Sequence, residues 1–496
     1  MVAFGLDRTY LLSVPTDYDS NVPHRLVFGY HGTNCVLPPM ATKKYHTSRS
    51  ARFTKLGALS AKVGSSYVGH AVRGALQTAE GRAKSLLRTN TTNAMRVART
   101  FGELKGAVMK VGQMLSLQED LLPPEMREVL RGLQNQAPPV PFSNMFPVLR
   151  AELGTRLDRF AEISESAHAS ASIGQVHRAT LDTGEQVVVK IQYPGVEEMV
   201  ESDLRNIRAF AGSLRWVTPL KADLRKFLNE VRGKLIEELD YRVEARNMQR
   251  FGEMFRRDTR FIIPRPVADL CTRRVLTSEY QPGISADDLC DPSVPQSRRD
   301  AMGAHLFDAV WIQFFEHRTL QSDPNFANFA FTNDQRIVMY DFGCVKEFSP
   351  EFVSGFRTLA RDALDAGYGR LEADMARLGY VDLGREHLPE SVYRDYADAI
   401  CGGWREPGLY DFGASTIREQ VIRLNQKHWT KVFDYDAPAE AIFLERTLGG
   451  MFGNLVKLRA RIPMHELLAK HLRDPDRNSR NELAENASTA ARLKRW

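Results

Sequence analysis

The sequence predicts an α+β fold in which a small β-rich lobe precedes a larger helical lobe, with a helical extension before both. Short runs with β-branched residues are concentrated between residues 160 and 283. After Gln281, Pro282 and Gly283 the pattern is mostly helical up to residue 473. Strands first and helices afterwards are typical of a two-lobed domain, so we place the lobes at 160–283 and 284–473.

Length, charge and cysteine usage limit the class of protein. The chain has 496 residues, 43% of them hydrophobic, with a net charge of +6 and a pI near 9.0. A mild basic excess suits an acidic surface such as phospholipid, although it is more often simply a solvated surface. The five cysteines form no CxxC pair, and no apolar run approaches the length of a membrane span. We therefore expect a reduced, intracellular protein without structural zinc, with only peripheral membrane contact and no nucleic-acid partner.

Residues 1–39 differ from everything after them. Tyr10–Asp19 and His24–Asn34 predict two strands ending in a His-Gly turn, which is similar to the opening of an α/β-hydrolase, where that turn supplies an oxyanion hole. No GxSxG nucleophile motif follows, so no hydrolase site can be completed. We interpret the segment as a fusion remnant or a misplaced start, with Met40 as the true beginning, and expect it to be poorly packed or disordered.

Residues 40–159 form the expected helical extension. Ala, Lys, Arg and Leu dominate from Ala41 to Leu122. Within it, Met95–Gln118 carries apolar residues at helical spacing, and a proline pair at 123 and 124 ends the pattern. A second proline-rich segment, 137–142, separates the extension from the β-rich lobe.

The β-rich lobe contains a predicted hairpin. A run from Ile173 to Thr180 is followed by a turn at 182–184 and then by the strand QVVVKIQ. A long helical region, 224–257, comes next, and two more strands are expected near 261–267 and 274–280. At the other end of the chain, residues 474–496 are charged without apolar period, which predicts a loose polar tail.

The residues that indicate a chemistry lie in the helical lobe, in QSDPNFANF followed by YDFG. Asp323 and Asn328 have the spacing of the catalytic-loop Asp and Asn of protein kinases, and Asp341 begins the following Asp-Phe-Gly. Asp323 would orient or deprotonate the acceptor, while Asn328 and Asp341 would hold Mg²⁺, a cation that prefers oxygen ligands. One Asp-Pro-Asn alone is usually a turn, but together these groups predict phosphoryl transfer from ATP. Gln321 and Ser322 replace the usual His and Arg, so we expect an atypical kinase.

A nucleotide site also needs groups from the β-rich lobe. Lys190, at the end of VVVK, is the candidate for the α- and β-phosphates, although a strand lysine alone is more often a solvated strand end. The loop His168–His177 occupies the place of a glycine-rich phosphate loop but has one glycine, so it should be stiffer and approach phosphates differently. The predicted nucleotide-binding residues are Ala169, Ala171, Ser172, Gly174, Lys190 and Glu279.

The acidic segment Arg232–Phe251 is predicted to be one continuous helix. At 100° per residue, Asp240 and Glu244 fall on nearly one face, whereas Glu238 lies about 120° from Glu244 around the axis, so two separate partners are expected. The alternative is a solvated helix face whose carboxylates pair with arginines of the same helix, Arg242 and Arg246.

Six motifs in order resemble those of the UbiB-type, or aarF-domain-containing, atypical kinases. They are KVGQ at 110–113, ASASIGQVH at 169–177, VVVKIQYPGV at 187–196, EELDYRVEA at 237–245, QSDPNFANF and DFG. The helical remainder, including residues 443–463, is similar to the coenzyme Q-associated members. One small departure is Ser170, which stands where many relatives have Ala and could alter nucleotide preference.

The resemblance implies a protein-kinase-like fold, binding of ATP and Mg²⁺, and support of ubiquinone or other isoprenoid-lipid metabolism at a membrane. Lys110 and Gln113 match a KxGQ helix that lies across the docking site for protein substrates in that family. Glu238 matches the partner of that lysine, and Glu244 matches the helix Glu that pairs with Lys190. The implied catalytic set is thus Asp323 with the Lys190 and Glu244 pair.

The leading hypothesis is an ATP-hydrolysing atypical kinase coupled to lipids or to lipid-modifying enzymes. True transfer to a small molecule or a protein is the second hypothesis, and a nucleotide-binding pseudokinase scaffold is the third. The expected partners are isoprenoid or quinone lipids, enzymes of lipid biosynthesis and a second copy of the chain. The expected location is the cytoplasmic membrane surface of a bacterium or the matrix side of the mitochondrial inner membrane.

Overall fold

In a computed structural model of the chain, the described residues are 140–381 and 388–473, except 172, 203, 206–231, 234, 235, 237 and 429–437, together with scattered positions between 54 and 100. The chain divides into two units, Met1–Lys44 and Tyr45–Trp496, and every described residue lies in the second. The hydrolase-like segment, the KxGQ residues Lys110 and Gln113, Ser172 and the polar tail therefore lie outside the described residues.

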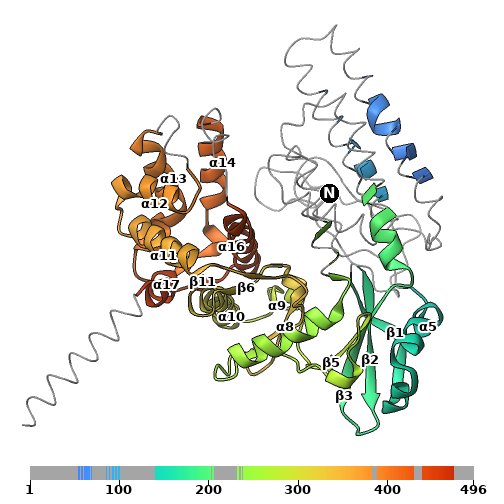
Figure 1. Ribbon diagram of the computed structural model, residues 1–496. Helices are drawn as coiled ribbons and strands as arrows, with labels where there is room; N and C mark the ends of the chain where they lie inside the picture. Colours follow the sequence, from blue (N-terminus) through green and yellow to red (C-terminus); the bar gives the residue numbers. More distant parts are fainter. Residues whose placement is uncertain are drawn as a thin grey trace, which may run out of the picture. The chain divides into compact units, whose positions relative to one another are not determined.

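The first lobe is built on a four-stranded antiparallel sheet of order β1-β2-β3-β5 (Figure 1). The predicted hairpin is confirmed as β2 and β3, and Gly184 in its turn has a φ of 87°, which favours glycine. Alternate residues of β3 are buried, so Lys190 lies on the opposite face from Val189 and Ile191. The strands are β1 (Phe160–Ser170), β2 (Gly174–Leu181), β3 (Gln186–Gln192) and β5 (Val275–Glu279).

Helices α5 and α8 pack against this sheet. Helix α5 (Phe142–Leu153) contacts β3 and β1, and a single 3₁₀ segment, Gly154–Arg159, leads from it into β1. Helix α8 (Tyr241–Met254) contacts β5. Its apolar face repeats at the helical period, and the buried positions also include one acid, Glu244.

The prediction of one continuous helix over 232–251 is wrong, because the helical backbone stops before Asp240. Asp240 has φ −119° and ψ 93°, and its carboxylate accepts a hydrogen bond from the backbone N–H of Arg242. It is therefore the N-cap of α8 and does not share a helix face with Glu244. The predicted angle between Glu238 and Glu244 also fails, since the two residues lie on different sides of this break.

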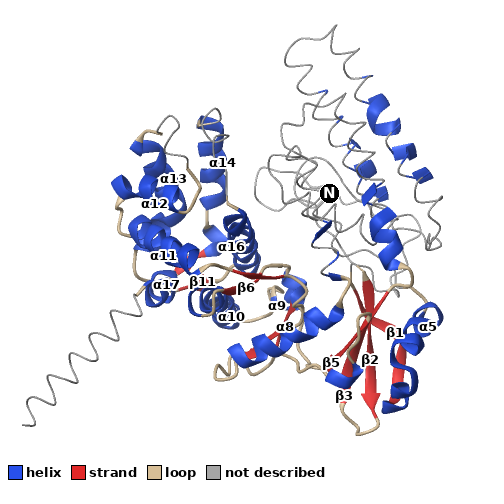
Figure 2. Cartoon of the chain, in the orientation of Figure 1, coloured by secondary structure: helices blue, strands red, loops and turns tan. Residues whose placement is uncertain are grey.

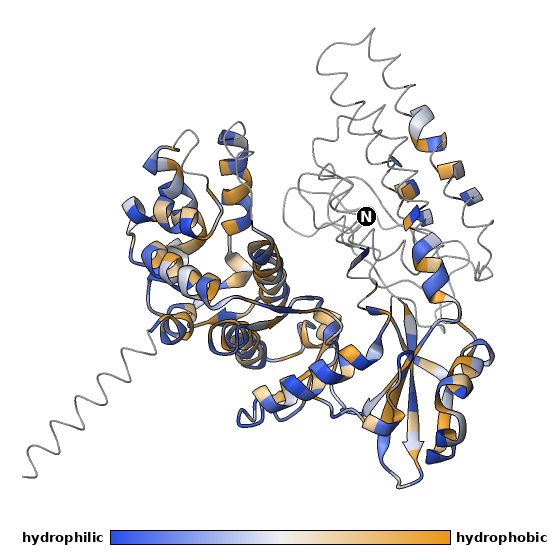
Figure 3. Ribbon diagram, viewed as in Figure 1, coloured by the Kyte–Doolittle hydropathy of each residue, from blue (hydrophilic) through white to orange (hydrophobic). Residues whose placement is uncertain are grey.

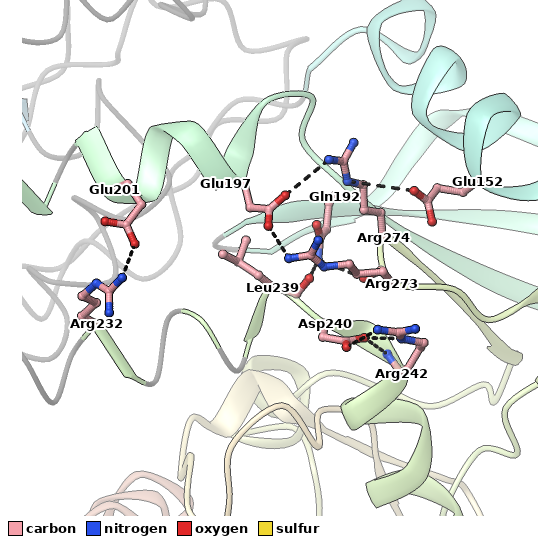
Figure 4. Close-up of polar contacts among 10 residues, drawn as sticks. All are labelled: Glu152, Gln192, Glu197, Glu201, Arg232, Leu239, Asp240, Arg242, Arg273 and Arg274. Carbon is pink, nitrogen blue, oxygen red and sulfur yellow. Dashed lines mark hydrogen bonds and ion pairs between the residues drawn. The ribbon is translucent and has the colours of Figure 1, made fainter.

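The break is tied to the sheet (Figure 4). Gln192, at the end of β3, donates its side-chain amide to the carbonyl oxygen of Leu239 at 2.9 Å. The backbone N–H of Tyr241 donates to the carbonyl oxygen of Arg273 at 2.9 Å. Arg273 and Arg274 also pair with Glu197. These contacts fix where α8 begins relative to β3 and β5, and hence which residues of α8 face the sheet.

The second lobe is mainly helical (Figure 2). Its described α-helices are α9 (Ala286–Leu289), α10 (Gln296–Trp311), α11 (Pro350–Leu364), α12 (Tyr368–Arg377), α13 (Glu390–Arg405), α14 (Ile417–Lys427), α16 (Ala439–Leu458) and α17 (Met464–Leu472). Short strand pairs join its loops: β6 (Thr319–Gln321) with β9 (Val345–Glu347), β7 (Phe329–Phe331) with β8 (Ile337–Met339), and β10 (Tyr410–Asp411) with β11 (Arg461–Ile462). Strand β4 (Phe261–Ile262) adds to β8 in parallel.

The helices of this lobe carry both hydrophobic and hydrophilic residues, as expected of helices that are buried on one face only (Figure 3).

One charged group, Asp308 of α10, is fully buried and links α17 to the core. Its carboxylate contacts Arg260, Lys470 and His471 at 2.6 to 2.8 Å. Burial disfavours the Asp308 anion, but these three donors more than offset that effect and lower its pKa. The predicted order, sheet first and helices afterwards, is confirmed.

Candidate active site

Lys190 and Glu244 form a buried ion pair between β3 and α8. The Lys190 ammonium donates to both carboxylate oxygens of Glu244, at 2.7 and 2.9 Å, and the two side chains are only 15% and 5% exposed. Glu244 reaches the sheet because it lies in the first turn of α8, whose start is fixed at Asp240. The alternative of a solvated acidic helix face is therefore wrong for Glu244. Asp240 does pair with Arg242, but as the N-cap of α8 and not from a helix face.

Burial and charge act in opposite directions on this pair. Burial alone lowers the pKa of Lys190, but the carboxylates of Asp341 and Glu244 outweigh it and raise that pKa well above its ordinary value. Burial raises the pKa of Glu244 to about 7, although Lys190 acts to lower it. The neighbouring carboxylates thus favour the ammonium form of Lys190, while burial favours the protonated form of Glu244.

Asp341 joins the pair from the second lobe. Its Oδ2 lies 3.6 Å from the Lys190 ammonium, and its Oδ1 accepts a hydrogen bond from the N–H of Gly343 at 2.9 Å. Phe342, which lies between Asp341 and Gly343 in the sequence, is fully buried and contacts Phe251 of α8, with 4.8 Å between the ring centroids. Asn247 of α8 donates to the carbonyl oxygen of Phe342 at 2.9 Å. One helix therefore holds both the ion pair and the Asp-Phe-Gly turn.

Gln321 connects the loop that carries Asp323 to the turn that carries Asp341. Its side-chain amide donates to the carbonyl oxygen of Asp323 at 3.0 Å and to that of Asp341 at 3.1 Å. Gln321 is itself fixed, because its backbone N–H donates to the side chain of Gln313 at 2.9 Å. Ser322 bonds the carbonyl of Cys344 through both its N–H and its hydroxyl. The residues that replace His and Arg thus hold the two loops together.

The side chain of Asn328 is attached to the Asp323 loop through its nitrogen. Its side-chain nitrogen donates to the carbonyl of Asp323 at 3.3 Å, which commits the nitrogen and leaves the amide oxygen as an acceptor. Together with the Asp341 carboxylate this gives two hard oxygen donors, the type of ligand that Mg²⁺ uses alongside substrate phosphates. No group of three or more His, Cys, Asp or Glu suited to a metal occurs among the described residues. The donor set fits Mg²⁺ shared with a nucleotide.

The predicted phosphate loop is a tight hairpin end. Ala169 is exposed, and the N–H of Ala171 donates to the carbonyl of Gly174 at 2.9 Å, which closes the turn between β1 and β2. Gly174 is buried, and a Cβ there would lie 2.5 Å from the carbonyl oxygen of Ile191 and 2.6 Å from the Tyr241 hydroxyl. Packing against β3 and α8 is therefore what requires glycine at this position.

The remaining predicted residues are placed as follows. The Glu279 side chain is held by Arg265, 2.6 Å from its Nε, and the backbone N–H of Glu279 donates to the carbonyl oxygen of Arg265 at 3.0 Å. Glu238 is half-buried just before the break. Lys110 and Gln113 lie outside the described residues, so the pairing of Glu238 with Lys110 stays a prediction.

Two residues at this site were missed from the sequence. Asn247 is three positions after Glu244, so the helical period could have placed it beside the ion pair. Arg446 of α16 has its guanidinium 4.0 Å from the carboxylate of Asp323. It lies more than a hundred residues further along the chain, and local spacing cannot reveal such a contact.

The arrangement combines a buried cation with oxygen donors and a nearby carboxylate, which are the kinds of group that phosphoryl-transfer sites use. Comparison with known proteins identifies the family of the chain. A family model described as the ABC1 atypical kinase-like domain matches residues 132–373. A solved structure described as a complex of Rv3197 with erythromycin from Mycobacterium tuberculosis is 28% identical with a TM-score of 0.56, covering 78% of this chain and 97% of that chain.

Two curated relatives are similar over most of their length. The mitochondrial atypical kinase COQ8B of Rattus norvegicus is 32% identical over 439 residues, 86% of this chain and 80% of that protein. The mitochondrial atypical kinase COQ8 of Saccharomyces cerevisiae is 33% identical over 422 residues, 82% of this chain and 81% of that protein. The predicted two-lobed, kinase-like α+β fold is confirmed. The chain belongs to the ABC1, or UbiB-type, atypical kinase family.

Proposed function

We propose that this protein binds Mg-ATP and hydrolyses it in a cycle that supports ubiquinone or other isoprenoid-lipid metabolism at a membrane surface. The observation that carries the nucleotide part is the contact of the Lys190 and Glu244 pair with Asp341, which brings groups of both lobes to one point. A buried cation held by a glutamate, beside an acid that can share a metal with phosphates, suits a polyphosphate substrate.

Each residue has a role in this proposal. Lys190 binds the α- and β-phosphates, and Glu244 holds the lysine in place. Asp323 accepts a proton from the attacking water. Mg²⁺, held by Asn328 and Asp341, would neutralise charge on the phosphates. The hairpin end from Ala169 to Gly174 covers the nucleotide, and the backbone near Glu279 contacts the base.

The lipid part of the proposal is supported by the relatives, which include mitochondrial COQ8 proteins and the chloroplastic ACTIVITY OF BC1 COMPLEX KINASE 8 of Arabidopsis thaliana. The basic pI near 9.0 suits an anionic membrane surface. None of the described helices has both the length and the hydropathy to span a bilayer. We propose peripheral contact with an organelle membrane, and quinone or isoprenoid lipids and their biosynthetic enzymes as partners.

The test is ATP turnover by the full chain, with and without vesicles of phosphatidylcholine containing an anionic phospholipid, and with and without a ubiquinone headgroup analogue. We expect Mg-dependent turnover that rises with the anionic vesicles or with the headgroup. Stimulation by neither would contradict the lipid part alone. Stoichiometric transfer of the γ-phosphate to a lipid or protein would favour a true kinase, and binding without any turnover would favour a scaffold. The same assay on a chain starting at Met40 tests whether residues 1–39 contribute.

A further inference from the structure

Arg446 of α16 faces the catalytic loop. Its terminal nitrogen lies 4.0 Å from Oδ1 of Asp323, and the two side chains are 17% and 24% exposed. A separation of 4.0 Å is within ion-pair range but beyond hydrogen-bond distance. The charges therefore attract, yet the donors of the guanidinium are not used by Asp323.

One face of α16 is docked on this loop. Gly450 lies against Pro324, so closely that a Cβ on Gly450 would be 2.2 Å from the proline ring. Asn454 donates its side-chain amide to the carbonyl oxygen of Pro324 at 2.9 Å. Arg446, Gly450 and Asn454 are spaced by four residues, which places them along one side of the helix. The helix thus presents Arg446 to Asp323 in a fixed register.

The guanidinium of Arg446 has a donor, Nε, without a partner among the described residues. Its Nε is buried without a hydrogen-bond partner, and the structure gives Arg446 no hydrogen bond to another described residue. A planar guanidinium has five N–H donors, and a buried donor left without a partner is costly. Phosphate oxygens match its geometry well, and an arginine contact with the transferring phosphoryl group is a strong stabiliser in other phosphoryl-transfer sites.

We infer that Arg446 is a catalytic residue that binds the phosphoryl group as it passes from ATP to water. This inference rests on the proposed function. In the step, the bond from the γ-phosphorus to the bridging oxygen breaks and leaves its electron pair on ADP. A water oxygen forms the new bond to phosphorus, and the water proton passes to Asp323. The transferring phosphoryl group stays negative while Asp323 gains the proton and loses its charge, so the Arg446 cation beside Asp323 is left to act on the phosphoryl oxygens.

The experiment compares the full-length wild type with Arg446→Gln, Arg446→Lys and a control, Arg423→Gln, which removes an exposed arginine of α14. Three quantities are measured: kcat and KM for Mg-ATP, affinity for Mg-ADP, and affinity for Mg-ADP with aluminium fluoride, which mimics the phosphoryl group in transfer. The free energy of unfolding in urea is measured alongside.

We expect Arg446→Gln to lower kcat by about 10²- to 10³-fold with Mg-ADP affinity within about twofold of wild type. Aluminium fluoride should tighten Mg-ADP binding in the wild type and in Arg423→Gln but not in Arg446→Gln, and Arg446→Lys should recover part of both effects. Normal turnover in Arg446→Gln would overturn the inference, as would retained tightening by aluminium fluoride. Parallel loss of Mg-ADP affinity and stability in both Arg446 variants would assign the residue a structural role instead. Absence of Mg-ATP turnover and of nucleotide binding in the wild type would overturn the proposed function itself.

Discussion

The side-chain amide of Gln321 donates to the main-chain carbonyl of Asp341 at 3.1 Å, and this contact joins the catalytic loop to the Asp-Phe-Gly turn. The same nitrogen donates to the carbonyl of Asp323 at 3.0 Å. A neutral amide therefore sets the distance between the expected base and the expected metal ligand. The loop lacks the usual His and Arg but is still fixed in place. Gln321 and Ser322 both donate hydrogen bonds to carbonyl oxygens of the segment after β8.

Replacing Gln321 by Ala should loosen this connection. Two carbonyl oxygens lose a buried donor, which should lower the free energy of unfolding by about 1–3 kcal/mol. The two loops should also separate, so kcat should fall more than the affinity for ADP. Urea unfolding and steady-state turnover measure the two effects. The matched control is Gln420→Ala on α14, whose side chain donates to the hydroxyl of the exposed Thr416. Equal loss in both variants would contradict a positioning role for Gln321.

The pH dependence of nucleotide binding should report Glu244. Burial raises its pKa to about 7, so below that pH the carboxyl gains a proton and releases its hold on the Lys190 ammonium. We expect kcat/KM for Mg-ATP to rise with pH through an apparent pKa near 7, and this rise should be absent in Glu244→Gln.

The free energy of unfolding should change with pH in the direction opposite to kcat/KM. Because the folded-state pKa of Glu244 is raised above the unfolded value, the unfolded chain binds fewer protons between about pH 4.5 and 7. The contribution of Glu244 to the free energy of unfolding should therefore fall as pH rises through that window. Urea unfolding of Glu244→Gln is compared with that of Glu253→Gln, which changes an exposed acid of the same helix. The comparison separates the effect of Glu244 from that of other carboxyls. An unchanged slope in Glu244→Gln would contradict the raised pKa.

Gly174→Ala should destabilise the first lobe. The new Cβ would meet the carbonyl oxygen of Ile191 and the Tyr241 hydroxyl at 2.5 and 2.6 Å, and such overpacking costs about 1–3 kcal/mol. Gly252→Ala on α8 is the control, because a Cβ there meets nothing within 4 Å and alanine favours a helix by about 1 kcal/mol. Unfolding midpoints in urea should therefore move in opposite directions for the two variants, and a shift in the same direction would be against this account.

Gly450→Ala should displace the catalytic loop. Its Cβ would overlap the ring of Pro324, so either α16 or the Asp323 loop must shift. We expect a fall in kcat of about tenfold or more, since small misplacements at a reacting centre are costly. Gly449 and Gly453 lie on the same helix, and a Cβ at either position would meet nothing within 4 Å. Gly449→Ala and Gly453→Ala should therefore both keep wild-type turnover. Similar losses of turnover in all three variants would mean that the effect comes from changing α16 itself and not from the contact with Pro324.

Local patterns predicted the parts of the site that lie close together in sequence. The hairpin of β2 and β3 follows from its turn residues, and the order of Asp323, Asn328 and Asp341 follows from spacing alone. The interruption at Asp240 could not be predicted by helical period, because an aspartate inside a helical pattern and an N-cap aspartate differ only through contacts such as that of Gln192 with Leu239. Arg446 was missed for a similar reason, since the docking of α16 on Pro324 is a tertiary contact.

The central claim is tested most directly by Mg-dependent nucleotide binding of Asp341→Asn, measured by titration calorimetry on the full chain with and without Mg²⁺. The account predicts that wild type and Asp334→Asn, an exposed aspartate of the β7 and β8 hairpin, bind ATP more tightly with Mg²⁺ and turn it over. Asp341→Asn should lose both the Mg²⁺ effect and turnover. Mg-dependent binding and full ATPase activity in Asp341→Asn would contradict the assignment of this site.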